Sequence, residues 1–550
     1  MKKLQKSSLK ISSLRGLAAA AVIAGAGLWA LPGMARTFVH PGLSYTDADF
    51  TRMRAMIASG KQPYVKTFEA LKASGYSNPG QGVPERGSQI KEGAFNNMVG
   101  IDGRKAHDLA LLWRLTDDTR YADKAVEFLN ANSYYTNTSA RGTGPLDNGK
   151  VYLLIEAAEM LRDYAGWKAE DQQRFKDMLV YPGYSSTENQ YDLHANSDDA
   201  QNGITFYWNI FNFDASRFGN QGLFAARAMM AMGVYLDNEK IYDRALRYLR
   251  GLPHREDDLL YVAGPPRTSE TPYALDETAP EAGDKTTTFM LGYSLQGRDN
   301  SIEDYGYDEQ LRYYIYKNGQ SQEACRDQDH AMVGVGLLAD VAEIAWNQGD
   351  DFYGDLDNRI LKGMEWSFRY NLSFIETPGS AWEPSQFTTD EDEASFENGA
   401  FLRVRSRSGR WESKLPSTKG RGDSFGAGGN REQALAHYMV RAGEKTRASE
   451  NPESYRWLKA YRDYMMDKFG YESYGKDTGH AYEWKGWGSL TKRLDPIEDS
   501  VETGVEEATV IEPVAEADEY ISLQGIRIKE PTAPGIYLRK KNGKMEKVAF

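Results

Sequence analysis

The residues best suited to chemistry lie in one short run, YYIYKNGQSQEACRDQDH, which ends at His330. If a helix begins near Gln322, Arg326 and His330 lie four residues apart on one of its faces. A guanidinium beside an imidazole forms an edge that recognises carboxylates, because both groups donate hydrogen bonds to oxygen. The run therefore predicts an anion-binding edge.

Two carboxylates in the same run, Asp327 and Asp329, could hold the imidazole of His330 in one tautomer or pair with Arg326. The structural alternative is an Arg–Asp pair at the surface and a histidine that only completes its helix. A metal site at His330 with Asp327 or Asp329 would lack a third convincing ligand, and the sequence has no HxxxH spacing. The sequence predicts neither a metal site nor a cofactor.

A second run, 196–222, mixes aromatic and amide side chains. Aromatic faces stack on sugar rings, and amides bond hydroxyls and carboxylates, so the mixture is typical of a glycan cleft. The alternative is that the aromatic residues are core and that Asn220 caps a helix. The candidates are Asn202, Tyr207, Trp208, Asn209, Phe211, Asn212, Phe213 and Asn220.

The elements that position these runs are helix hairpins, which recur along the chain with polar turns. Each hairpin has an apolar stripe that only a neighbouring hairpin can cover. Long Gly-, Pro- and Asp-rich insertions separate the copies, which favours a ring around a cleft over a regular solenoid. We expect a mainly α fold, an (α/α) toroid built as an incomplete barrel of hairpins, with a minor β component in 395–425. The four copies are 106–129, 223–249, 333–370 and 431–465.

Residues 1–35 have the layout of a secretory signal peptide, with five basic residues, then an apolar run from Gly16 to Leu31, then small residues. A retained N-terminal anchor is the alternative. We expect an exported protein that is periplasmic, on the cell surface or secreted, with no integral membrane segment after cleavage. Cys325 is the only cysteine, so packing rather than a disulfide must stabilise the fold.

Charge is unevenly distributed along the chain. The predicted catalytic domain, 36–493, has a net charge of −13, and the following segment, 494–520, has −10. Such a domain will not bind nucleic acid through its net field, and an anionic substrate must meet a local basic patch. We interpret 494–520 as an acidic linker.

The last segment, 521–550, alternates short β-prone runs with turns, which predicts a small β-rich tail domain. It resembles the sorting domains that the type IX secretion machinery recognises, through an L-x-G-[KR]-x strand and a G-x-Y strand. A frayed tail is the alternative. The matching residues are Leu523, Gly525, Arg527, Gly535 and Tyr537.

Residues 38–492 resemble the alginate-lyase-domain polysaccharide lyases, especially those that act on alginate or glucuronan. The central QEACRDQDH is similar to the family's Q-E-S-G-R-D-Q-x-H element, and AHYMVRAG to its N-H-Y element. Ala324 and Cys325 replace a Ser-Gly pair, and Ala436 replaces an asparagine. Further similar segments are 38–70, 345–366 and 486–491.

The resemblance implies β-elimination on a 1,4-linked uronate polysaccharide such as alginate, polymannuronate or glucuronan, which leaves 4,5-unsaturated uronate ends. Asn220, Arg326 and His330 would neutralise the C6 carboxylate, and a tyrosine would move the proton. Tyr207, Tyr314, Tyr316 and Tyr438 compete for that role, and we favour Tyr316 or Tyr438. The substrate-binding residues implied are Asn202, Tyr207, Trp208, Gln322, Glu323, Gln328 and His437.

Two other functions remain open at this stage. A glycoside hydrolase on the same fold would need two carboxylates flanking the bond, and Glu323, Asp327 and Glu383 could supply them. A surface glycan-binding protein would retain the polysaccharide without cutting it. The preferred sugar, whether mannuronate, guluronate or glucuronate, and endo versus exo action do not follow from the sequence.

Overall fold

The computed structural model divides into a short N-terminal unit, Met1–Thr37, and a large unit, Phe38–Phe550. The predicted signal peptide and most of the acidic linker lie outside the described residues. The structure describes 36–90, 96–136, 138, 144–180, 206–211, 213, 219–258, 309–316, 318–372, 401–405, 410–414, 416–422, 431–441, 452–472, 485–494, 519–522, 527–528, 536–541 and 544–549.

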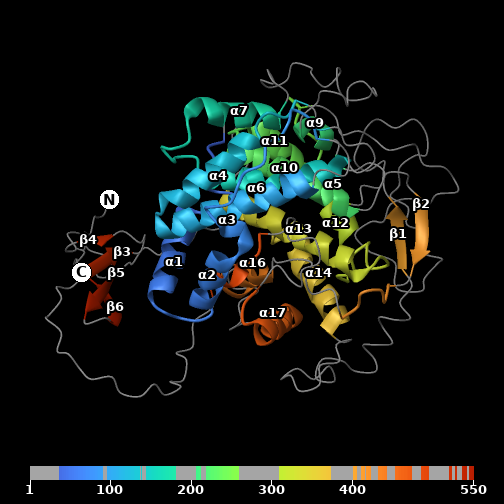
Figure 1. Ribbon diagram of the computed structural model, residues 1–550. Helices are drawn as coiled ribbons and strands as arrows, with labels where there is room; N and C mark the ends of the chain where they lie inside the picture. The colour runs from blue at the N-terminus through green and yellow to red at the C-terminus, as the bar shows by residue number, and fades with distance from the viewer. Residues whose placement is uncertain are drawn as a thin grey trace, which may run out of the picture. The chain divides into compact units, whose positions relative to one another are not determined.

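The described part of the large unit is mainly helical (Figure 1). Its first half contains α1 (Asp47–Ala58), α2 (Tyr64–Ala73), the π-helix η2 (Asn96–Gly100), α3 (Ile101–Thr116), α4 (Thr119–Ala131), α5 (Gly144–Gly149), α6 (Tyr152–Met160), α7 (Ala169–Leu179), α9 (Phe206–Ile210), α10 (Gly219–Tyr235) and α11 (Glu239–Leu249). Its second half contains α12 (Leu311–Tyr314), α13 (Gln328–Asn347), α14 (Asp355–Leu372), α16 (Arg431–Ala436), the π-helix η6 (His437–Arg441), the 3₁₀ turn η7 (Pro452–Tyr455), α17 (Arg456–Phe469) and α18 (Gly488–Thr491).

All four predicted hairpins are confirmed, as α3–α4, α10–α11, α13–α14 and α16–α17. The polar turns of these hairpins contain the residues that end the first helix and cap the second. Asp117 ends α3 in a left-handed conformation with φ 59°, and Asp118 caps α4 by accepting from the Arg120 amide. Asn238 caps α11 in the same way, through the amide of Ile241.

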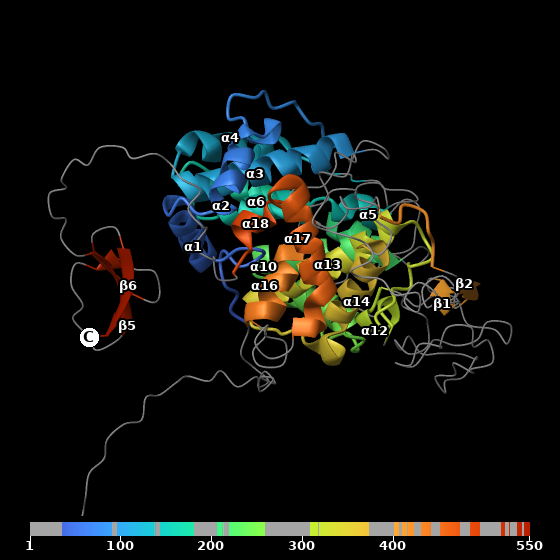
Figure 2. The ribbon, with the colours of Figure 1, turned by 90° about the horizontal axis from the view of Figure 1, so that it is seen from below.

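Contacts between helices run through the described part in a closed series: α1 packs on α3, α3 on α6, α6 on α10, α10 on α13, α13 on α16, α16 on α18, and α18 on α1. Figure 2 shows α13, α16 and α17 side by side. The first and last helices of the described part thus meet, since α18 contacts both α1 and α2. This arrangement is consistent with the predicted toroid. In the described part of the chain, no helix combines the length and the apolar character needed to cross a membrane.

Buried ion pairs on α13 hold this series together. Asp340 is fully buried and contacts Arg227 Nη1 and Lys485 Nζ, each at 2.7 Å. One turn later, Glu343 accepts from Arg441 at 2.6 Å and from Lys492 at 2.7 Å. Charges in a low-dielectric interior persist only when paired, so α10, η6 and the 485–492 segment are tied to α13.

The strands are few and short. β1 (Phe401–Arg405) and β2 (Arg410–Lys414) form an antiparallel hairpin in which Phe401 pairs with Lys414, which confirms the β component expected in 395–425. Toward the C-terminus the strand order is β4–β3–β5–β6, with antiparallel neighbours. That these strands make a separate domain stays a prediction. Their bounds are β3 (Glu519–Ser522), β4 (Arg527–Ile528), β5 (Ile536–Lys541) and β6 (Lys544–Ala549).

A carboxyl on α14 caps α17. Glu365 accepts from the backbone amides of Trp457 at 2.9 Å and Leu458 at 2.7 Å. Burial raises the pKa of Glu365 to about 8, although the two amides act in the opposite direction. The folded protein therefore binds one more proton than the unfolded chain between about pH 4.5 and pH 8, so this group stabilises the fold less as pH rises through that window.

Glu365→Gln should remove that part of the pH dependence. As pH rises from 5 to 9, we expect the thermal unfolding midpoint of the variant to rise relative to that of the wild type. Calorimetry at several pH values measures this difference. A difference that stays constant across the range would contradict the raised pKa.

Candidate functional site

The centre of the candidate site is the buried carboxylate of Glu323. It accepts from the backbone amide of Asn220 at 3.1 Å and from Asn220 Nδ2 at 2.8 Å. The Tyr314 hydroxyl donates to it at 2.7 Å, and Arg326 Nη1 lies 3.5 Å away. We call Asn220, Tyr314, Glu323 and Arg326 the Glu323 cluster. It joins the first turn of α10 to the segment before α13, so residues about a hundred positions apart form one site.

The segment before α13 differs from the prediction. The helix begins at Gln328 rather than near Gln322, because Asp327 adopts a non-helical conformation and its side chain accepts from the amide of His330. Residues 321–326 form turns, in which the Arg326 amide donates to the Glu323 carbonyl at 2.8 Å. Arg326 and His330 therefore do not share a helical face, and a described partner of Arg326 is Glu323.

His330 is oriented by Asp327, which confirms one of the two predicted partners. Nδ1 of His330 lies 2.6 Å from Asp327 Oδ1. Burial alone would raise the pKa of Asp327, but the hydrogen bonds and charge of His330, with a smaller contribution from the charge of Arg326, outweigh it and lower that pKa. An ionised Asp327 can accept a proton from Nδ1, and in that tautomer Nε2 is the ring's proton acceptor.

Solvent reaches two of these residues. The side chain of Arg326 is 22% exposed and that of His330 is 39% exposed, whereas Asn220, Tyr314 and Glu323 are buried. A polymer could therefore touch Arg326 and His330 directly. The buried residues of the cluster are linked to Arg326 through Glu323.

Residues 61–258 match the alginate lyase family model. The match runs from just before α2 to just after α11, so it includes Asn220 and Tyr207 and ends before the segment with Arg326 and His330. The match supports the prediction that the chain is a polysaccharide lyase. Comparison with curated proteins gave no match.

Solved alginate lyases are structurally similar to this chain. One from Bacteroides ovatus is 13% identical and aligns over 77% of this chain and 96% of its own, with a TM-score of 0.39. Alginate lyase A1-III from Sphingomonas species A1 is 12% identical over 83% of this chain and 98% of its own, with a TM-score of 0.36. A variant of A1-III in complex with a tetrasaccharide is 11% identical over 74% and 91%, with a TM-score of 0.39.

The tyrosines proposed for proton transfer are buried. The hydroxyl of Tyr438 donates to the Tyr353 carbonyl at 3.1 Å, and burial raises its pKa well above the usual value. Tyr316 is also buried, and Tyr207 packs edge-on against Phe211 at 5.6 Å. Neither Tyr438 nor Tyr207 has a described contact with the Glu323 cluster. The catalytic roles of Tyr316 and Tyr438 stay predictions, and these positions suit packing better than contact with a polymer.

Most of the other predicted binding residues have structural partners. Gln328 is buried; it donates to the Ala324 and Ser417 carbonyls and accepts from Asn371. Gln322 is buried beside Tyr314.

His437 is buried too, and it stacks on Tyr353 with the ring centroids 4.0 Å apart. Burial lowers its pKa to about 3, so it is neutral at physiological pH. Asn202 lies outside the described residues, and for Trp208 only the backbone, in α9, is described.

Sequence reasoning missed the contact between Tyr314 and Glu323, for which a signal existed. Asn318-Gly319 is a typical turn dipeptide, and the structure has a tight reversal there, with Gly319 at φ 90° and Ile315 bridged to Ser321. This reversal brings Tyr314 back beside the Gln322–Glu323 pair. Within the described ranges, no three histidine, cysteine or carboxylate side chains come together in a way that could hold a metal ion.

Tyr314 reaches Glu323 only because α13 has a glycine beside it. A Cβ on Gly334 would lie 1.5 Å from the Tyr314 hydroxyl oxygen and 2.3 Å from its ring carbon. We therefore expect Gly334→Ala to displace Tyr314, to lower turnover of a uronate polymer by about tenfold and to cost about 1–3 kcal/mol of stability through overpacking. Initial rates and urea unfolding measure the two effects.

The matched control is Gly75→Ala, since nothing lies within 4 Å of a Cβ at Gly75. That variant should unfold and turn over as the wild type does. Wild-type turnover in Gly334→Ala would show that the Tyr314–Glu323 hydrogen bond does not matter to the site.

Proposed function

We propose that this protein is a polysaccharide lyase that cuts a 1,4-linked uronate polysaccharide, such as alginate, polymannuronate or glucuronan, by β-elimination. The observation that carries the proposal is the solvent-facing pair of Arg326 and His330, each positioned by a carboxylate, Glu323 and Asp327 respectively. The alginate lyase match to residues 61–258 supports the same class of enzyme.

In this reaction a base removes the proton at C5, the C4–C5 double bond forms, and the C4–O4 bond breaks as O4 gains a proton from the protonated base or from water. Negative charge develops on the C6 carboxylate as C5 loses its proton. Arg326 supplies a fixed positive charge for it, and its geometry is set by Glu323 before substrate arrives. Such preorganised donors commonly contribute roughly 10²–10³ in rate.

His330 is our candidate for the base. With Nδ1 donating to Asp327, its Nε2 would be the proton acceptor, and its side chain is the most exposed of the site's groups. The buried hydroxyls of Tyr316 and Tyr438 are less accessible to a polymer. Asn220 supports Glu323, since both of its donors are directed to that carboxylate.

The test is to follow ultraviolet absorbance while the purified protein acts on alginate, polymannuronate, polyguluronate and glucuronan. Elimination creates an unsaturated uronate that absorbs, so absorbance should rise on at least one polymer. Chain shortening without absorbance would indicate hydrolysis, and retention without shortening would indicate a binding protein. Either result would overturn the proposal.

We also propose that the chain is exported through residues 1–35 and that 521–550 addresses it to a secretion machinery. The basic-apolar-small layout at 1–35 and the pattern of Leu523, Gly525, Arg527, Gly535 and Tyr537 support these two steps. Expression of the full chain with and without 521–550, followed by fractionation, tests both. Full-length protein confined to the cytoplasm with an intact N-terminus would contradict export.

A further inference from the structure

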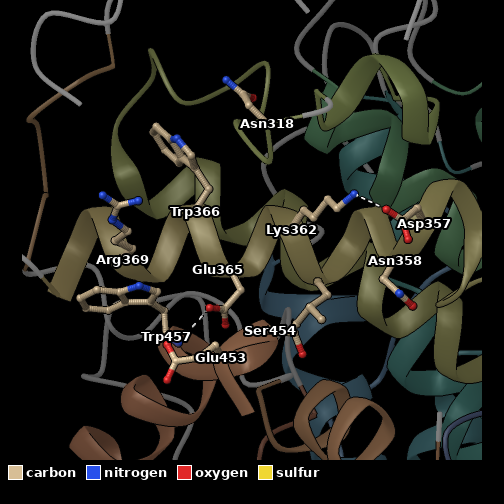
Figure 3. Close-up of a pocket in the computed structure, with 11 residues that line it drawn as sticks. Asn318, Asp357, Asn358, Lys362, Glu365, Trp366, Arg369, Glu453, Ser454 and Trp457 are labelled. Carbon is tan, nitrogen blue, oxygen red and sulfur yellow. Dashed lines mark hydrogen bonds and ion pairs between the residues drawn. The ribbon is translucent and has the colours of Figure 1, made fainter. Parts of the chain in front are cut away.

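A cavity of about 520 Å³ lies between α14 and the start of α17, and its lining shares no residue with the Glu323 cluster (Figure 3). Its volume is within the range of roughly 300–1,000 Å³ that is typical of ligand pockets. We call it the α14–α17 pocket. Six of its lining residues matter here: Asn318, Asp357, Lys362, Trp366, Arg369 and Trp457.

Two indoles form the aromatic part of the pocket. Figure 3 shows Trp366 and Trp457 on opposite sides of α14, near the end of the helix where Arg369 lies. Trp366 is partly exposed and stacks on Tyr370, with 5.1 Å between the ring centroids and 14° between the planes. Trp457 is nearly buried, and the Arg456 guanidinium lies over its ring, 5.3 Å from the centroid. The partly exposed ring of Trp366, held by its stacking on Tyr370, is the one suited to stacking on a sugar ring.

The charged residues of the pocket favour an anion. Asp357 is paired with Lys362 at 2.7 Å, and Glu453 lies 3.6 Å from Arg456, so each of these carboxylates is balanced by a cation. The third carboxyl of the lining is Glu365, whose pKa burial raises to about 8, so it is mainly uncharged at pH 7. The cations of the lining are Lys362 and Arg369, and a guanidinium such as that of Arg369 can bind a carboxylate through charge-assisted hydrogen bonds.

We propose that the α14–α17 pocket is a second carbohydrate-binding site that takes a short segment of an acidic glycan. Trp366 stacks on a sugar ring, Trp457 forms part of the pocket's apolar wall, Arg369 binds a carboxylate, and Asn318 and Lys362 bond hydroxyl or carboxylate oxygens. The choice of a uronate as ligand rests on the function proposed above. A site of this kind would hold a polymer on the enzyme between cuts.

The test is isothermal titration of the full chain carrying His330→Gln, a change meant to prevent cleavage during the measurement. The probes are tetrasaccharides of mannuronate and of glucuronate, and cellotetraose is the neutral control. We expect two binding sites per chain for a uronate probe. Adding Trp366→Ala or Arg369→Gln should leave one site, or weaken the second at least tenfold. Cellotetraose should bind the pocket at least tenfold more weakly.

Two controls keep the result interpretable. Arg120→Gln removes an exposed arginine far along the chain and should leave both sites unchanged. Trp366→Phe keeps an aromatic face, so it should retain the second site where Trp366→Ala loses it. Circular dichroism and the thermal midpoint verify that each variant folds.

The outcomes separate this proposal from the lyase assignment. If no uronate polymer is cut by the wild type, the lyase assignment fails, and pocket-dependent binding of the tetrasaccharide would still support the second site. If the polymer is cut but Trp366→Ala and Arg369→Gln bind the tetrasaccharides as their His330→Gln parent does, the second site is overturned. Equal affinity for cellotetraose would overturn the role of Arg369.

Discussion

Arg326→Ala is expected to lower turnover of a uronate polymer by roughly 10²–10³-fold, since removing one preorganised donor to a developing anion commonly has that effect. Arg326 is the cation through which the buried Glu323 cluster can act on a carboxylate. The fold should survive, because its side chain is partly exposed and its partner Glu323 keeps hydrogen bonds from Asn220 and Tyr314. Initial rates by ultraviolet absorbance and the unfolding midpoint measure the two effects.

Two further variants sharpen this experiment. Arg326→Lys keeps a positive charge but loses the planar fork, so its rate should lie between those of the wild type and Arg326→Ala. Arg120→Ala removes an arginine whose side chain is 76% exposed, and it should have wild-type turnover. Near-normal turnover in Arg326→Ala would remove Arg326 from the mechanism.

Asp340→Ala is expected to destabilise the fold by about 3–5 kcal/mol, because it leaves Arg227 and Lys485 buried without their shared carboxylate. Burial alone would raise the pKa of Asp340, but the charges of Lys485 and Arg227 outweigh it and lower that pKa. The stabilisation is thus present above the unfolded pKa of about 4 and is lost as pH falls through the lowered folded pKa. Urea unfolding at pH 7 measures the effect.

The control for Asp340 is Glu69→Ala, which breaks an exposed pair with Lys72 and should cost no more than about 1 kcal/mol. Adding Lys485→Met to Asp340→Ala removes one of the stranded charges and should restore part of the lost stability. A loss below about 1 kcal/mol in Asp340→Ala alone would show that Asp340 does not hold α10 and the 485–492 segment on α13.

The helix hairpins could be predicted from sequence because their signals are local. Apolar residues at helical spacing define α3 and α10, and Asp118 and Asn238 mark the starts of the helices that follow. The predicted start of α13 was wrong. The run from Gln322 could have been helical, but Asp327 caps the helix, so α13 begins at Gln328.

By itself the sequence determined the helical hairpins and, as one of two options, the pairing of His330 with a nearby aspartate. That Arg326 binds a substrate carboxylate stays a prediction. Only the tertiary structure decided that Glu323 is buried and binds Asn220, because these two residues are 103 positions apart and no local pattern encodes their contact. The tertiary structure also decided that Tyr316 and Tyr438 are buried. A tyrosine has the same chemistry in a core or a cleft, and its surroundings, built from distant helices, decide which role it can take.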